Sequence, residues 1–371
     1  MKEAFSRALL DWFDREAREL PWRLPGPGGL RRDPYQVVVS EIMLQQTQVS
    51  AVIPYFKRFM QAFPDFAALA AAPEVEVLKY WEGLGYYRRA RMLHKLALCL
   101  MEDYGGQLPR DRKVLLKLPG VGPYTAGALL SFAFDLPEAA VDGNLVRVFA
   151  RLDAIAFVQG DVKAQREVRE RVTGLIPDVR AGDFSESLIE LGATVCLPKT
   201  PLCGACPVRD WCRAHTLSRT GDFPLPAKQA DRPVSRLTYL LLEEDGQIYC
   251  QRRPEGLLAG LYEFLALPDK AGPRSKKKAL TLFEKEYPKL AGHDADWTWL
   301  GEGRTVFSHR VWEFAVWSVK LKAGTLLLED EGGDANDPAA FSAGELAGLP
   351  FPAFLIPWRD GWIQDRLTPD F

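Results

Sequence analysis

The chain has 371 residues, of which 47% are hydrophobic and 26% are charged. This length suits two domains, and the hydrophobic content supports a buried core in each of them. No apolar run approaches the length of a membrane span, and the net charge of −2 is not that of a strongly basic nucleic-acid-binding protein.

The first polar side chain that stands out is Glu41, within the otherwise apolar, helix-like run that begins at Ser40. Burial in such a run disfavours the ionised carboxylate and raises its pKa. A glutamate of this kind can act as a general acid near neutral pH. The alternative is a carboxylate near the start of a helix capped by Ser40.

A glycine-rich turn follows at residues 118–127 and predicts a helix, a hairpin and a second helix. Gly120 and Gly122 allow positive φ and a close approach of the backbone to another molecule, and Pro123 suits the first turn of the second helix. That helix would direct free N–H groups at a phosphate-sized gap. Because the carboxylate of Asp142 follows, the pattern predicts chemistry on a nucleic acid; the alternative is an ordinary turn between helices.

Four cysteines lie close together with the spacing C-x6-C-x2-C-x5-C. Four thiolates this close can enclose one metal centre, either zinc or a [4Fe–4S] cluster. Disulfides are disfavoured, because we expect no signal peptide and find only two further cysteines, Cys99 and Cys250. Zinc sites more often contain two C-x2-C pairs, so the spacing favours the iron–sulfur cluster. The predicted ligands are Cys196, Cys203, Cys206 and Cys212.

The last third of the chain has the pattern of a separate α+β domain. Prolines and polar residues at 221–233 predict a linker, and the following domain covers residues 234–371. Strands are expected at residues 237–242 and 247–252 around a turn at 243–246, with a further strand within 306–319. Residues 276–287 predict a helix, with Ser275 as a possible N-cap.

The hairpin, the aspartate and the cysteine loop together resemble the helix-hairpin-helix DNA glycosylases of the endonuclease III superfamily. The resemblance covers residues 1–220. It implies a mostly α domain with two helical subdomains, a DNA-binding cleft between them, and a [4Fe–4S] loop at 196–212. It also implies that the N-terminal segment returns to pack with the cluster subdomain.

Within this superfamily, the segment around Glu41 resembles the catalytic helix of the MutY-type adenine glycosylases. In the endonuclease III branch a lysine of the hairpin helix attacks the sugar, and here Tyr124 holds that place, so no strong lyase activity is expected. Residues 20–23 resemble the segment near the adenine pocket, and residues 184–193 resemble the helix that supplies a carboxylate near the base. The resemblance thus implies substrate or DNA contacts for Trp22, Arg23, Leu44, Gln46, Tyr86, Gly120, Gly122 and Glu186.

Residues 256–264 resemble the entry to a Nudix fold, but the glutamate-rich run that holds magnesium in Nudix hydrolases is missing. This combination matches the MutT-like C-terminal domain of MutY proteins, which helps to recognise 8-oxoguanine. The resemblance implies that Ser308 offers a hydroxyl to the altered purine edge and that Phe307 and His309 frame it.

The implied reaction is removal of adenine from duplex DNA opposite 8-oxoguanine or guanine. The enzyme would flip the adenine out of the stack, and protonated Glu41 would give its proton to N7. Asp142, with an ordinary or low pKa, would stabilise the sugar cation, while Tyr124 and Asn144 position the carboxylates and the water. A monomer in the cytoplasm, associated with the chromosome, is expected.

Three alternatives stay open: a pyrimidine-lesion glycosylase with lyase activity, a catalytically inactive damage-binding protein, and a nucleotide pyrophosphatase. The lyase is disfavoured by Tyr124, and the inactive protein is disfavoured by the presence of both Glu41 and Asp142. The pyrophosphatase is disfavoured by the missing glutamate run. Residues 1–220 hold 29 Lys and Arg against 26 Asp and Glu, a net charge of only +3. DNA affinity is therefore expected from local patches such as Arg88, Arg89, Arg91 and Lys95, or Arg209 and Arg213.

Overall fold

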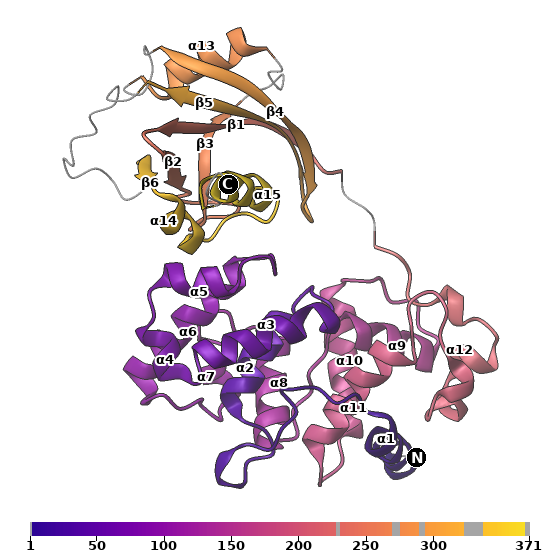
Figure 1. Cartoon of the computed structure of the whole chain (residues 1–371). Helices are drawn as coiled ribbons and strands as arrows, with labels where there is room; N and C mark the ends of the chain where they lie inside the picture. Colours follow the sequence, from indigo (N-terminus) through magenta and orange to yellow (C-terminus); the bar gives the residue numbers. More distant parts are fainter. Residues whose placement is uncertain (1, 228–230, 269–274, 289–293, 323–336, 368–371) are drawn as a thin grey trace. The chain divides into compact units, whose positions relative to one another are not determined.

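The computed structural model describes residues 2–227, 231–268, 275–288, 294–322 and 337–367, and the chain divides into two compact units. The first unit comprises Met1–Ala71 and Met92–Lys228 and is helical. The second comprises Ala72–Arg91 and Gln229–Phe371 and contains a β-sheet (Figure 1). A stretch of 20 residues within the helical part of the chain thus belongs to the unit that contains the sheet.

The helices of the first unit begin at residues suited to that place. Asp33, Asp111, Asp142 and Asp161 each accept a hydrogen bond from a backbone N–H of the following first turn. The elements are α1 (Lys2–Glu16), η1 (Pro27–Gly29), α2 (Pro34–Leu44), α3 (Val49–Ala62), α4 (Phe66–Ala71), α6 (Arg88–Tyr104, which begins in the second unit), α7 (Arg112–Leu115), α8 (Pro123–Ala128), η2 (Leu129–Ala133), α9 (Gly143–Asp153), α10 (Val162–Leu175), α11 (Ala181–Thr194), η3 (Cys203–Ala205), η4 (Arg209–Trp211), α12 (Arg213–Thr216) and η5 (Thr220–Asp222).

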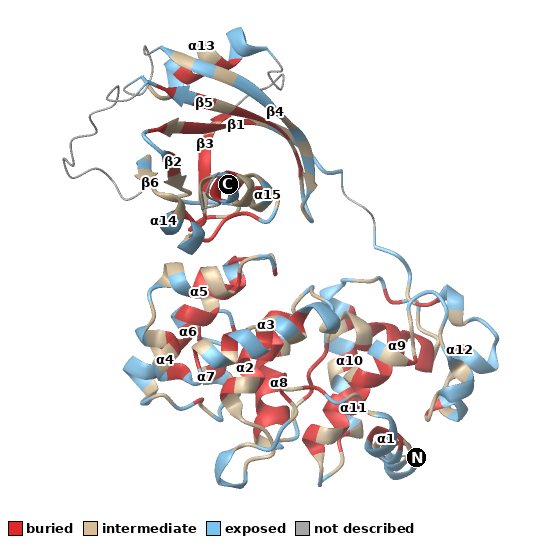
Figure 2. Ribbon diagram, in the orientation of Figure 1, coloured by how far each residue is buried: buried red, intermediate tan, exposed pale blue. Residues whose placement is uncertain are grey.

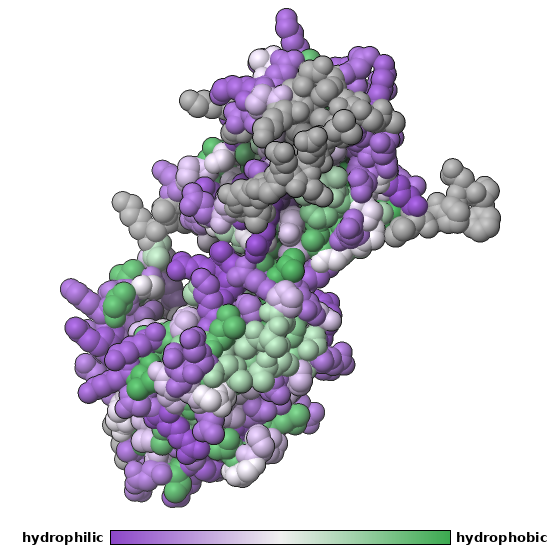
Figure 3. Space-filling view, turned by 90° about the vertical axis from the view of Figure 1, so that its left-hand side faces the viewer, coloured by the Kyte–Doolittle hydropathy of each residue, from purple (hydrophilic) through white to green (hydrophobic). Residues whose placement is uncertain are grey.

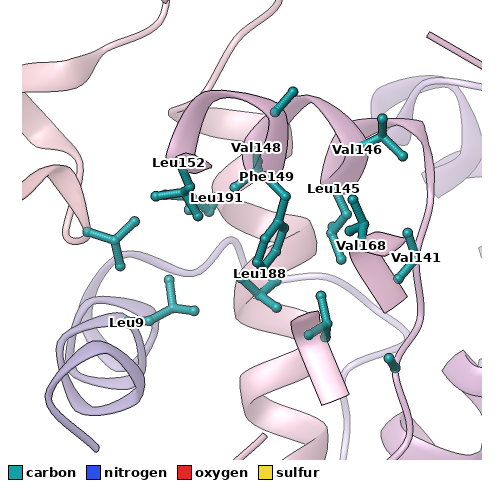
Figure 4. Packing of buried hydrophobic residues seen from close by; sticks show 14 of the residues in the cluster. Leu9, Val141, Leu145, Val146, Val148, Phe149, Leu152, Val168, Leu188 and Leu191 are labelled. Carbon is teal, nitrogen blue, oxygen red and sulfur yellow. The ribbon is translucent and has the colours of Figure 1, made fainter. Parts of the chain in front are cut away.

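The N-terminal helix α1 packs against the part of the chain that leads to the cysteines. Leu9 of α1 belongs to one apolar cluster with Leu152 of α9 and Leu188 of α11 (Figure 4). Phe5 contacts Trp211 of the cysteine loop edge to face, with ring centroids 5.7 Å apart. The expected return of the N-terminal segment to this subdomain is therefore confirmed.

The described residues of the second unit form a six-stranded mixed sheet in the order β4-β5-β1-β3-β2-β6. β1 and β5 are parallel, and the other neighbours are antiparallel. β1 and β2 are joined by a tight turn in which Asp245 and Gly246 both have positive φ, as this type of hairpin requires. The strands are β1 (Val234–Glu244), β2 (Gln247–Arg252), β3 (Tyr262–Pro268), β4 (Ala295–Val306), β5 (Val311–Leu321) and β6 (Ala339–Phe341).

Alternating residues of the strands supply two cores, one on each face of the sheet. Tyr239 and Leu241 of β1 face a cluster with Leu355 and Trp362, whereas Leu240 and Leu242 face the other cluster with Phe283. Figure 2 shows the central strands as mostly buried. The α+β prediction and the hairpin at 243–246 are confirmed. The helices of this unit are α5 (Glu74–Tyr80), α13 (Lys276–Glu286), α14 (Ala343–Gly348) and α15 (Ile356–Leu367).

One face of the molecule shows the distribution of polar and apolar side chains on the surface. The face in Figure 3 is largely hydrophilic, with hydrophobic residues in smaller patches. None of the helices that the structure describes is both long and apolar enough to cross a membrane. The segment predicted as a linker is partly ordered against the first unit, because Leu225 forms a bridge with Val158; residues 228–230 of it lie outside the described residues.

Candidate active site and cysteine loop

Glu41 and Tyr124 meet in the interior of the helical unit. Glu41 lies in the last turn of α2 and is only 7% exposed, and Tyr124 at the start of α8 donates its hydroxyl to Glu41 Oε2 over 2.7 Å. Burial raises the pKa of Glu41 to about 7, against the lowering effect of the Tyr124 hydrogen bond. Glu186 and Asp142 raise this pKa further, which places both carboxylates close by. Because α2 is capped by Asp33, the alternative of Glu41 as an N-terminal carboxylate is wrong.

Asp142 is the N-cap of α9, and its two carboxylate oxygens accept different hydrogen bonds. Oδ1 accepts from the backbone N–H of Leu145 over 2.8 Å, and Oδ2 accepts from Asn144 Nδ2 over 2.7 Å. Burial nevertheless raises the pKa of Asp142, although these hydrogen bonds and Arg147 lower it. The ordinary or low pKa expected from the sequence is thus not what the structure has, because the burial of this helix end is not visible in the sequence.

Three arginines surround the carboxylate of Glu186 in α11. Arg31 pairs with Glu186 and with Asp183, Arg32 Nη2 lies 3.2 Å from Glu186 Oε2, and Arg23 Nε lies 3.6 Å from Oε1. Arg23 also lowers the pKa of Glu41, which places it at the same site. Trp22 is 5% exposed and packs edge to face on Phe56 of α3. Trp22 is therefore buried next to an arginine of the site, and its contact with the substrate stays a prediction.

The hairpin before α8 is present, but its two glycines differ. Gly120 has φ +74°, and an added Cβ would lie 2.9 Å from Met92 Cβ, so only glycine fits without strain. Gly122 has φ −96° and is the N-cap of α8, so the positive φ that both glycines allow is adopted by Gly120 but not by Gly122. Nothing lies within 4 Å of a Cβ built on Gly122, which leaves the backbone N–H end of α8 open for another molecule.

Two other predicted DNA contacts have a left-handed backbone. Gln46 lies just beyond Leu44, the last residue of α2, and is exposed with φ +58°. Tyr86, in the second unit, has φ +50° and is 45% exposed. Left-handed non-glycine residues are uncommon and gather at ligand clamps and active sites. The third predicted contact loop, Phe307 to His309, joins β4 to β5, with Phe307 half-buried against Trp312 and the other two side chains exposed.

The four cysteines of the loop line one hollow that opens to solvent. Among the residues that the structure describes, no group of three His, Cys, Asp or Glu side chains is arranged to hold a metal ion. Four thiols around one hollow supply the four sulfur ligands that a [4Fe–4S] cluster uses. Burial raises the pKa of Cys206 to about 12, and the three other thiols add to this, so a cationic centre is required to hold all four as thiolates. Cys196, Cys203, Cys206 and Cys212 therefore fit an iron–sulfur cluster.

Two buried arginines of α9 connect the cysteine loop with Asn144. Arg147 donates to the carbonyl oxygen of Cys196 over 2.9 Å, and its Nη2 donates to Asn144 Oδ1 over 2.9 Å. One turn later, Arg151 donates to Leu197 O over 2.7 Å and approaches Cys196 Sγ at 3.4 Å. A continuous set of hydrogen bonds therefore runs from the loop through Arg147 and Asn144 to Asp142.

The sequence interpretation missed four arginines of this region and the carboxylate of Glu190. Arg147 and Arg151 are spaced i, i+4 on an otherwise apolar helix, and that spacing is a signal that could have identified them. Glu190 is fully buried and pairs with Arg18 and Arg23, one turn beyond Glu186. Arg31 and Arg32 follow a Pro/Gly loop, and no local pattern links them with α11.

Comparisons with known proteins agree with this geometry. Residues 39–174 match the HhH-GPD superfamily of base excision DNA repair proteins, and residues 196–212 match the iron–sulfur binding domain of endonuclease III. The adenine DNA glycosylase of Rattus norvegicus is 37% identical over 371 aligned residues, covering 87% of this chain and 71% of that protein. The Mycolicibacterium smegmatis adenine DNA glycosylase is 42% identical over 58% of this chain and 70% of its own.

A solved structure shares the fold of the helical unit. A thermostable thymine-DNA glycosylase covers 58% of this chain and 97% of its own, with a TM-score of 0.52 and 30% identity. The cysteine loop, the hairpin and the buried acid lie inside regions that the family matches cover. With the rat enzyme matched along most of both chains, this chain belongs to the adenine DNA glycosylases, DNA N-glycosylases of base excision repair with an iron–sulfur binding domain.

Proposed function

We propose that this enzyme removes adenine opposite 8-oxoguanine or guanine in duplex DNA by hydrolysis, and leaves an abasic site without cutting the strand. The observation that carries the proposal is the buried Glu41, hydrogen-bonded to Tyr124 and close to Asp142 and Glu186. This arrangement supplies one proton donor and one anionic stabiliser at the same place, which hydrolysis of an N-glycosidic bond requires.

The first step is proton transfer from Glu41 to N7 of the flipped adenine. With a pKa of about 7, a large fraction of Glu41 is protonated at neutral pH. Protonation makes adenine a better leaving group, and the electron pair of the breaking C1′–N9 bond goes to the base. Glu186, which pairs with Arg31 and Arg32, would contact the same base.

The second step is stabilisation of the positive sugar and addition of water. Asp142 accepts hydrogen bonds from Leu145 and Asn144 that favour its ionised form, and this carboxylate faces the developing oxocarbenium ion. Water adds at C1′ and loses a proton to a carboxylate, which completes hydrolysis. Asn144 and Tyr124 position the two acids.

Strand cleavage is not expected from this site. A lyase reaction needs an amine that forms a Schiff base with the sugar. Tyr124 stands where the endonuclease III branch has its lysine, and burial raises the pKa of this phenol well above its ordinary value. The side chain therefore stays a neutral hydrogen-bond donor to Glu41.

Recognition of the opposite base is assigned to the exposed loop of Phe307, Ser308 and His309, with Tyr86 and Gln46 as wedges in the DNA stack. The iron–sulfur cluster would hold the loop at 196–212 in shape and place its Arg209 and Arg213 near phosphates, without taking part in the chemistry. A monomeric enzyme in the cytoplasm, associated with the chromosome, stays a prediction.

The test is single-turnover cleavage of a labelled duplex with one adenine opposite 8-oxoguanine, analysed with and without alkali. We expect adenine release, with strand breakage only after alkali, and no reaction with a thymine-glycol duplex. Asp142→Asn should abolish excision and keep DNA affinity, because the amide fills the same space but carries no charge. Wild-type turnover by this variant, or breakage without alkali, would contradict the proposal.

A further inference from the structure

The segment that carries Tyr86 belongs to the same compact unit as the β-sheet. Residues 72–91 contain α5, Trp81 and the loop that leads to Tyr86, and this segment groups with residues 229–371. Tyr86 therefore lies in the unit that contains the sheet. The contacts between its segment and the rest of this unit gather at Glu82.

Glu82 forms a bidentate, largely buried ion pair with Arg359 of α15. Arg359 Nη1 lies 2.6 Å from Glu82 Oε1, and Arg359 Nη2 lies 3.2 Å from Oε2. The two side chains are 6% and 12% exposed, so solvent screens the pair little. The backbone N–H of Phe351 also donates to Glu82 Oε1 over 2.7 Å. A carboxylate held by three donors in this way has a single preferred position.

Neighbouring groups bind to the same stretch of backbone. Lys79 Nζ donates to Glu82 Oε2 over 2.9 Å and to the carbonyl oxygen of Leu349 over 3.1 Å. Tyr87, on the other side of the loop, donates to Phe351 O over 3.2 Å and accepts from the N–H of Gly83 over 3.0 Å. Residues 349–351 therefore contact the loop on both sides of Tyr86.

The loop between these anchors has an unusual backbone. Gly83, Gly85 and Tyr86 all have positive φ, at 93°, 77° and 50°. The carbonyl oxygen of Gly85 accepts from Trp81 Nε1 over 3.0 Å and from Arg89 Nη2 over 3.1 Å. A left-handed tyrosine persists only where its surroundings determine the backbone, and here Glu82 and Tyr87 flank it.

We propose that the Glu82–Arg359 ion pair is a positioning device, through which the sheet-containing unit sets the conformation of Tyr86 and so the discrimination between 8-oxoguanine and guanine opposite adenine. The inference rests on the proposed substrate and on the proposed role of Tyr86. Arg359 contacts neither DNA nor the reacting atoms in this scheme. Its effect passes through Glu82 and the backbone of the loop.

The experiment compares single-turnover excision of adenine opposite 8-oxoguanine with that opposite guanine, and takes the ratio of the two rates. Glu82→Gln keeps the shape and the acceptor for Phe351 N–H but removes the charge. Arg359→Met keeps the apolar stem and removes both donors. The matched control is Arg236→Met, since Arg236 forms a solvent-exposed pair with Glu313 in the same unit. We expect both test variants to lower the ratio about tenfold, as for loss of a buried charged pair, and the control to leave it unchanged.

A double-mutant cycle with Tyr86→Leu separates the possible outcomes. If Glu82→Gln acts through Tyr86, it lowers the ratio in the wild type but not in the Tyr86→Leu background. If the wild type shows no preference for 8-oxoguanine over guanine, the proposed substrate is wrong. If Tyr86→Leu keeps that preference, the proposed role of Tyr86 is wrong. If Tyr86→Leu loses the preference while Glu82→Gln and Arg359→Met keep it, the positioning role is wrong. Should Arg359→Met fail to fold, Arg359→Lys replaces it, because lysine cannot make the bidentate pair.

Discussion

The two carboxylates of the site differ in their hydrogen-bond donors more than in their burial. Burial raises the pKa of both Glu41 and Asp142. Glu41 has one side-chain donor, the Tyr124 hydroxyl, whereas Asp142 accepts from Leu145 N–H and from Asn144. Donors to a carboxylate favour its ionised form. The hydrogen bonds around each carboxylate therefore favour Glu41 as the proton donor and Asp142 as the anion of the proposed reaction.

Glu41→Gln should abolish excision and change the dependence of stability on pH. In the wild type the protonated acid is present below about pH 7, so the excision rate should fall as pH rises through 7. Because the pKa of Glu41 is higher in the folded state than in the unfolded state, protonated Glu41 contributes to the free energy of unfolding below its ordinary pKa. This contribution of about 3 kcal/mol is lost as pH rises through 7.

The glutamine variant has no such loss, so its stability relative to the wild type should increase between about pH 5 and pH 8. Unfolding in urea at the two pH values measures the difference. Glu3→Gln, on the exposed face of α1, is the control. Parallel pH curves for the wild type and Glu41→Gln would show that Glu41 titrates normally in the folded protein.

Tyr124→Phe should move the alkaline limb of excision to higher pH. The hydroxyl donates to Glu41 Oε2 and lowers the pKa of that carboxyl, so its removal leaves burial less opposed. The measurement is the single-turnover rate across the pH range, with Glu41→Gln as the reference without an acid. A limb that stays in place, or moves to lower pH, would mean that Tyr124 does not act on the ionisation of Glu41.

The sequence could identify Glu41 as a candidate acid, but it could not show the contacts that Glu41 makes. Glu41 could be singled out because a carboxylate in an apolar helix stands out by itself. Its contact with Tyr124 joins residues 83 positions apart, and only the packing of α2 on α8 creates it. The raised pKa of Asp142 and the three arginines around Glu186 depend on burial and on distant segments in the same way.

At the level of elements, α9 joins the proposed chemistry to the cysteine loop. Asp142 caps its start, Asn144 lies in its first turn, and Arg147 and Arg151 contact the loop from successive turns. Gly192 of α11 allows this helix to come close, because a Cβ there would lie 2.9 Å from Asn144 Cβ. A change in the cysteine loop can thus reach Asn144 through one helix.

Arg147→Met should lower the excision rate by roughly tenfold or more, although Arg147 lies outside the proposed contacts with the base. The variant removes the donors to Asn144 Oδ1, Gly192 O and Cys196 O, so Asn144 loses its fixed orientation. Excision rate, DNA affinity and iron content per protein are measured together. Arg171→Met, which breaks an exposed pair with Asp153, is the control. A normal rate with normal iron content would contradict a positioning role for Arg147.

The elements themselves were mostly predictable, because capping residues, glycine turns and alternating apolar residues are local signals. The hairpin before α8 and the turn between β1 and β2 are examples. The sequence could not show which role Gly122 has, because glycine can serve as an N-cap as well as a positive-φ residue. The grouping of residues 72–91 with the sheet was not predictable, since it depends on single contacts such as Glu82 with Arg359.

For the whole molecule, the two units have different parts of the proposed task. Glu41, Asp142 and the cysteines lie in the helical unit, whereas Tyr86 and Ser308 lie in the unit with the sheet. The reaction and the reading of the opposite base should therefore respond to different substitutions. The net charge of −2 gives the chain little general attraction to DNA, so specificity must come from particular contacts.

Ser308→Ala should therefore weaken discrimination and leave the chemistry intact. Ser308 is exposed in the loop between β4 and β5, with its hydroxyl 3.3 Å from His309 Nδ1, so its removal should not disturb the fold. Loss of one hydrogen bond to the altered purine corresponds to about a tenfold slower excision opposite 8-oxoguanine, with the rate opposite guanine unchanged. Ser50→Ala, exposed on α3, is the matched control. Equal slowing opposite both bases would place Ser308 in general DNA binding, and no slowing would remove this loop from recognition altogether.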